Sequence, residues 1–126
     1  MKKTVFLIIL FMVINLSFAC AQDSIQKLKD TSPQQRAQFQ TNLMKQKLNL
    51  DSGQLNRVQA VNLKYALKFQ PIIKSDEGRF TKLRAAMALQ EQKDKELQTI
   101  FTKDQYTGYL AFEQELKSKL KARFKQ

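Results

Sequence analysis

Leu50-Asp51-Ser52-Gly53-Gln54 is one of three stretches in this chain that share a pattern. The others are Thr31-Ser32-Pro33-Gln34-Gln35 and Phe101-Thr102-Lys103-Asp104-Gln105. Each stretch places a small oxygen-bearing side chain three positions before a glutamine. This spacing is typical of a capping box, in which the first side chain accepts from the N3 backbone N–H and the glutamine accepts from the N-cap N–H. The three stretches therefore predict three helix starts.

Apolar residues flank two of the boxes. Leu50 and Leu55 enclose one, and Phe101 and Tyr106 enclose another. Such pairs form a hydrophobic staple, which fixes the angle at which the chain enters a helix. We interpret the capping motifs as structural rather than ligand-binding. Their residues are Ser32, Gln35, Leu50, Asp51, Gln54, Phe101, Thr102 and Gln105.

The first 21 residues have the pattern of a signal peptide. Lys2 and Lys3 precede an apolar run over residues 5–16, and Ala19-Cys20-Ala21 forms a small-x-small cleavage site. This order of basic, apolar and small residues is typical of secretory signals. We therefore expect residues 1–21 to be removed and the chain to be periplasmic.

The expected product consists of a flexible leader over residues 22–31 and a single helical domain over 32–126. Cleavage after Ala21 gives a soluble chain, which is the form we favour. Cleavage before Cys20 would instead leave a lipid-anchored chain. The bulky residue two positions before that cysteine fits a lipoprotein signal poorly.

The composition after residue 21 excludes most catalytic chemistry. That part of the chain holds no Cys, His or Trp and keeps a net charge of +9, against +11 for the whole sequence. Without imidazole or thiolate there is no ordinary general base near neutral pH and no Cys- or His-type metal site. We expect no enzyme, no cofactor and no metal. The positive charge favours acidic proteins as partners and, in an exported chain, not nucleic acid.

The apolar periodicity predicts an all-α protein with four helices. The first runs from about Pro33 to Leu48 and the second starts at Asp51 or Ser52. A third carries an apolar stripe that includes Phe80 and Leu97, and a fourth follows Thr102. No segment alternates apolar and β-branched residues as a strand does.

The helical pattern leaves the end of the second helix undecided and makes one prediction about exposure in the third. Pro71 should kink or end the second helix, so 75–78 is either a break or an imperfect turn inside one bent helix. The third helix is polar on all sides between Gln90 and Glu96, which predicts exposure there. The fourth has an apolar stripe that includes Tyr109 and Leu110.

A small apolar patch lies apart from the main stripe of the second helix. It is formed by Ala60, Leu63 and Leu67. The first helix or a dimer partner would bury it in a purely structural role. The alternative is an exposed strip that binds unfolded chains. We select as candidate client-binding residues Arg57, Leu63, Lys64, Leu67 and Lys68, with Lys117, Lys121 and Arg123 of the basic last helix in support.

The second and third boxes resemble the LTxxQ motif of the Spy/CpxP-type periplasmic helical proteins, in a Bacteroidetes-type version. Asp51 stands where the motif has Thr, and Phe101 where it has Leu. Both changes keep the capping and stapling roles. The resemblance extends over about residues 32–124, and the motif itself is short and degenerate.

The resemblance implies a four-helix protein of helical hairpins, often a cradle-like dimer, and so a possible homodimer here. It implies an ATP-independent chaperone that weakly binds unfolded or stress-damaged envelope proteins through a basic, partly apolar face. The alternative is an envelope-stress modulator that docks on a membrane sensor protein. Metal-responsive members use His, which this chain lacks. Membrane contact is expected only through a lipid on Cys20 or through the basic last helix.

Overall fold

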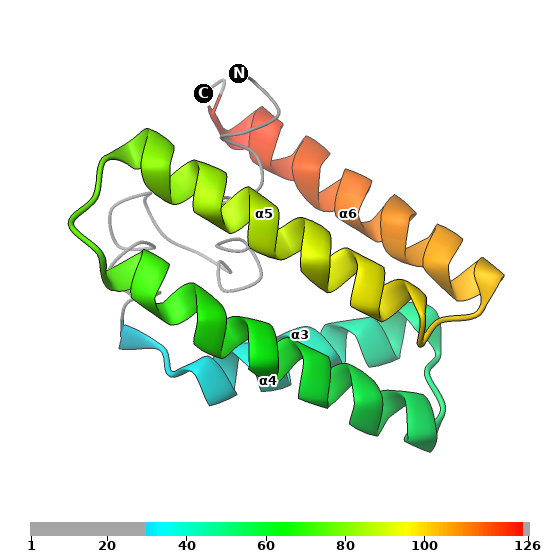
Figure 1. Ribbon diagram of the computed structural model, residues 1–126. Coiled ribbons are helices and arrows are strands. Elements are labelled where there is room, and N and C mark those ends of the chain that lie inside the picture. The colour runs from blue at the N-terminus through cyan, green and yellow to red at the C-terminus, as the bar shows by residue number, and fades with distance from the viewer. Residues whose placement is uncertain (1–29, 125–126) are drawn as a thin grey trace.

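A computed structural model of the chain describes residues 30–124, apart from the side chains of 116, 117 and 119–124. Within this part the fold is all-α, with four helices and no strand. The helices are α3 (Pro33–Leu48), α4 (Ser52–Lys74), α5 (Arg79–Gln98) and α6 (Lys103–Phe124). None of the described helices is long and apolar enough to span a bilayer. Figure 1 shows α5 above α4, with α3 behind α4 and α6 beyond α5 at the upper right.

All three predicted capping boxes form, and each starts a helix. At α3, Gln35 N donates to Ser32 Oγ at 3.1 Å, and Ser32 N donates to Gln35 Oε1 at 2.9 Å. Asp51 and Gln54 make the same two bonds at 2.8 and 3.2 Å. At α6, Thr102 and Gln105 make them at 3.2 and 2.9 Å. These bonds satisfy N–H groups that would otherwise lack a partner in the first turn.

The connection between α4 and α5 is a break, which resolves the choice left open by the sequence. Pro71 lies inside α4, and the helix continues beyond it to Lys74. Residues 75–78 are non-helical, and α5 then begins without a side-chain cap because Gly78 is its N-cap residue. α5 therefore starts without the capping box that starts each of the other three helices.

Two apolar clusters hold the helices together. The loop-end core lies where the α3–α4 and α5–α6 connections meet, and it consists of Met44, Leu48, Leu50, Val58, Leu97, Ile100, Phe101 and Tyr109. The mid-helix core joins α4 to α5 and consists of Tyr65, Phe69 and Ala86. Both box-flanking residues Leu50 and Phe101 are buried, as their stapling role predicts. Burial of these side chains supplies the main driving force for folding.

Two residues of the predicted apolar stripes lie at the surface. Phe80 is 69% exposed, and Leu110 is also among the exposed large apolar residues. Phe80 lies in the first turn of α5, next to the 75–78 connection, where no described helix covers it. An apolar stripe shows which residues share one face of a helix. It does not show how much of that face a neighbouring helix covers.

Candidate binding surface on α4 and α5

The apolar patch predicted on the second helix lies at the surface of α4. Leu67 is 49% exposed, Ala60 is exposed and Leu63 is half-buried. Within the described part of one chain, α3 therefore does not cover this patch. The α3-facing side of α4 instead carries Asn62, whose Nδ2 donates to Thr41 Oγ1 of α3 at 2.9 Å.

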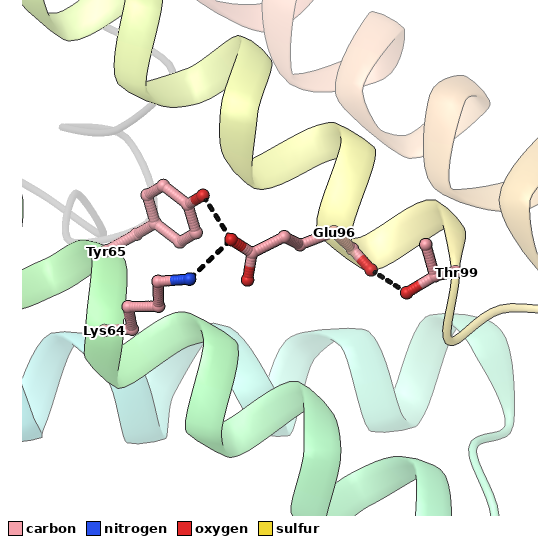
Figure 2. Close-up of polar contacts among 4 residues, drawn as sticks. All are labelled: Lys64, Tyr65, Glu96 and Thr99. Atoms are coloured by element: carbon pink, nitrogen blue, oxygen red, sulfur yellow. Dashed lines mark hydrogen bonds and ion pairs between the residues drawn. The ribbon is translucent and has the colours of Figure 1, made fainter.

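Beside this patch, four side chains of α4 and α5 form a polar cluster, which Figure 2 shows in part. Lys64 Nζ donates to Glu96 Oε1 at 2.5 Å, and Tyr65 Oη donates to the same oxygen at 2.7 Å. The ammonium groups of Lys64 and Lys68 lie 5.4 and 5.2 Å from the centre of the Tyr65 ring. Both distances fall in the range of cation–π attraction.

Helix geometry explains why these residues meet. Lys64 and Lys68 are one turn apart on α4, so they share a face on either side of Tyr65. Glu96 is in the last turn of α5. Its backbone carbonyl accepts a hydrogen bond from Thr99 Oγ1 at 2.7 Å, just after the end of the helix (Figure 2). The mid-helix core holds Tyr65 in place.

The electrostatics of the cluster follow from these contacts. The hydrogen bonds from Lys64 and Tyr65 hold the pKa of the Glu96 carboxyl below its usual value. Burial, together with the bond to Glu96, raises the pKa of Tyr65 to about 12. Glu96 is therefore an anion and Tyr65 a neutral donor near neutral pH. The cluster thus pairs a carboxylate with an ammonium group and a phenol hydroxyl.

The structure brings together some of the predicted site residues and not others. Leu63, Lys64, Leu67 and Lys68 lie within two turns of α4, and Arg57 is exposed nearer the start of the same helix. The support residues of the last helix are Lys117, Lys121 and Arg123. Their backbone belongs to α6, and their side chains lie outside the described part of the chain. Glu96 was not among the predicted residues, because nothing in the sequence brings it next to Lys64.

A second contact missed by the sequence analysis links two capping boxes. Gln54 Nε2 donates to Gln105 Oε1 at 2.6 Å, and Gln105 Nε2 donates to Gln54 Oε1 at 3.0 Å. Each amide also donates to a backbone carbonyl of the other hairpin: Gln54 to Ile100 at 3.1 Å and Gln105 to Leu48, the last residue of α3, at 3.4 Å. The boxes of Gln54 and Gln105 therefore cap their own helices and also join one helical hairpin to the other.

The prediction that the polar stretch of α5 is exposed was wrong at two positions. Gln90 and Lys93 are buried, and Lys93 Nζ donates to Gln40 Oε1 of α3 at 2.5 Å. Burial lowers the pKa of Lys93 to about 8. Lys93 thus contacts a polar residue of α3 rather than water, so the polarity of this stretch did not show which of its residues are exposed.

Polar contacts near Gln90 also link α5 to α6. Tyr109 Oη lies 2.7 Å from Asp94 Oδ1 and 2.9 Å from Glu113 Oε1. Gln90 Nε2 donates to Asp94 Oδ1 at 2.9 Å. These contacts stabilise the packing of α6, and burial with the two nearby carboxylates raises the pKa of Tyr109.

Comparison with known proteins gives a family match. A family model described as "Domain of unknown function (DUF4890)" matches residues 21–109. The match includes α3, α4, α5 and the start of α6, and so all three capping boxes. No curated protein and no solved structure matches the chain.

Proposed function

The chain belongs to the DUF4890 family, and for this member we propose a chaperone-like role without ATP. The protein weakly binds unfolded or stress-damaged proteins of the bacterial envelope and slows their aggregation. It acts in the periplasm after export. Kinship with the Spy/CpxP-type proteins is part of the same proposal and rests on the LTxxQ-like motifs.

One observation carries this proposal: an apolar side chain is exposed next to cations on one helix. Leu67 is 49% exposed, with Lys68 exposed beside it and Lys64 one turn away. Apolar contact supplies affinity for unfolded segments, and cations speed the encounter with acidic ones. A surface of this kind favours many weak partners over a single tight one, because its apolar area is small.

The test is an aggregation assay with the chain recovered after export. A reduced or urea-diluted client should aggregate more slowly in its presence at low salt, and the effect should weaken at high salt because ions screen the cations. Leu67→Ser should reduce the protection, and Gln46→Ser, which alters an exposed position of α3, should not. If several clients at several-fold excess of the protein aggregate at the unprotected rate, the proposal is wrong.

The envelope-stress modulator is the competing proposal for the same surface. A pull-down from envelope extract distinguishes the two. Many substoichiometric proteins would support the chaperone-like role, whereas one stoichiometric membrane sensor would support the modulator.

A further inference from the structure

We infer that Lys64, Tyr65 and Lys68 form a carboxylate-binding site that Glu96 occupies in the resting chain, and that an acidic segment of a client displaces Glu96. The inference rests on the proposed function and extends it. It names the chemistry of the bound segment, a carboxylate next to an apolar residue. It also assigns Glu96 the role of an internal competitor.

The first step is that a carboxylate already occupies the site. One oxygen of Glu96 accepts hydrogen bonds from both Lys64 Nζ and Tyr65 Oη, at 2.5 and 2.7 Å. Figure 2 shows these two donors converging on Glu96 from α4, while Glu96 extends from α5. The donors thus come from one helix and the acceptor from another. The carboxylate of another chain can therefore take the place of Glu96 without altering α4.

The second step is that this contact is open to exchange. The side chains of Lys64 and Glu96 are 47% and 38% exposed, so the ion pair lies at the surface. Ion pairs of this kind contribute little to stability because water and salt screen them. A client carboxylate therefore competes with a weak surface ion pair and with one part-buried hydrogen bond from the buried Tyr65 side chain.

The third step concerns the neighbours of the site. Lys68 Nζ lies over the same Tyr65 ring and forms no ion pair with any described residue within 4.0 Å. An incoming carboxylate thus meets two ammonium groups. Leu67 lies next to Lys68 in the chain and is exposed, so an apolar residue of the same segment can contact it. Charge and apolar surface together favour an acidic, partly apolar peptide.

The experiment compares two single substitutions on α5. Glu96→Gln removes the internal carboxylate but keeps an oxygen that accepts from Tyr65. Glu91→Gln is the matched control, because Glu91 is an exposed glutamate of α5 that pairs with Lys95 at 2.9 Å. Both variants change the net charge by the same amount. Binding is measured at low salt by fluorescence anisotropy of a labelled, unstructured peptide of alternating Glu and Leu, with a Gln–Leu peptide of equal length beside it.

We expect Glu96→Gln to bind the acidic peptide about two- to fivefold more tightly than the Glu91→Gln control, since a surface ion pair of this kind limits the gain to that range. Lys64→Met should weaken binding, and the Gln–Leu peptide should not distinguish the two glutamine variants. Equal affinities of the two variants for the acidic peptide would overturn the inference. If that happens while the unsubstituted chain still slows aggregation, the proposed function stands. If that chain neither binds the peptide nor slows aggregation, the proposed function fails as well.

Discussion

Gln54 and Gln105 each make local and long-range contacts with one amide group. The side-chain oxygen accepts from the N-cap N–H of its own helix and from the amide of the other glutamine. The side-chain nitrogen donates across to the other connection. The sequence predicts the local half, because the box spacing lies within five residues. The sequence cannot predict the long-range contacts, because these depend on which helix connections lie next to each other in the fold.

The amide pair gives a testable energetic coupling. Gln54→Ala and Gln105→Ala should each lower the free energy of unfolding by about 1–2 kcal/mol, since each loses a cap bond and cross-hairpin bonds. The double variant should lose less than the sum, by about 0.5–1.5 kcal/mol, because either change alone breaks the pair. Urea unfolding measures all three.

Gln35→Ala provides the control for this cycle. Gln35 completes the box at α3, is exposed, and forms no hydrogen bond with either of the other helix connections in the described part of the chain. It should cost no more than a lost cap, about 0.5–1 kcal/mol, and should add to Gln105→Ala without coupling. Additive losses for Gln54 and Gln105 would show that the amide pair does not contribute in solution.

Lys93 predicts how stability depends on pH. Its pKa is about 8 in the folded chain, lowered by burial from 10.5. Because the folded value lies below the unfolded one, the unfolded chain binds more protons between these two values. The free energy of unfolding should therefore rise with pH across this window. From pH 7 to 9.5 the contribution of Lys93 is on the order of 2 kcal/mol.

Unfolding curves of the unsubstituted chain and of Lys93→Met at several pH values measure this effect. The variant should be more stable at pH 7, since an apolar side chain of similar length avoids burying an ammonium group. The difference between the two proteins should then shrink as pH rises toward 9.5. Lys95→Met, at an exposed position two residues along α5, should leave the pH dependence unchanged. A difference between Lys93→Met and the unsubstituted chain that stays constant over pH would contradict the prediction.

At the scale of the elements, helix starts were more predictable than helix environments. The bounds of α3 match the prediction, and α4 and α6 start where their boxes place them. A cap is a local feature, so the sequence contains all of it. The end of α4 was not decidable, because a proline near a helix end can be accommodated or can terminate the helix. Here α4 runs past Pro71, and the break follows Lys74.

Burial along the elements was harder to predict, as α5 shows. Its exposed Phe80 and its buried Lys93 both reverse the expectation from hydropathy. Lys93 is buried because Gln40 of α3 supplies an acceptor, and the sequence gives no sign of that pairing. The candidate surface shows the same limit: its α4 residues share a recognisable face, whereas Glu96 of α5 joins them only in the folded chain.

For the whole molecule, the loop-end core makes the two helical hairpins dependent on each other. Met44, Leu48, Leu50 and Val58 come from the first hairpin, and Leu97, Ile100, Phe101 and Tyr109 from the second. Among the side chains that the structure describes, neither hairpin contains a complete apolar core of its own. Chains of fewer than about 50 residues seldom fold without such a core.

We therefore predict that fragments 30–77 and 78–126 are each largely unfolded. Circular dichroism should show little helix in either alone, and mixing them at equal concentrations should recover helix, because the cross-hairpin contacts then form between fragments. As a control, the intact chain carrying a protease site at 76–77 should keep its helix content after it is cut in the folded state. A cooperative thermal transition in one fragment alone would refute the prediction.

The Gln54–Gln105 pair also makes the molecule sensitive to one kind of chemical ageing. Deamidation of either side chain replaces an N–H donor with a carboxylate oxygen, so two oxygens would face each other across the hairpins. A change of about one mass unit at either position would therefore loosen the contact between the connections. Purified protein stored for long periods should be checked by peptide mass mapping at these two positions before its stability is compared between preparations.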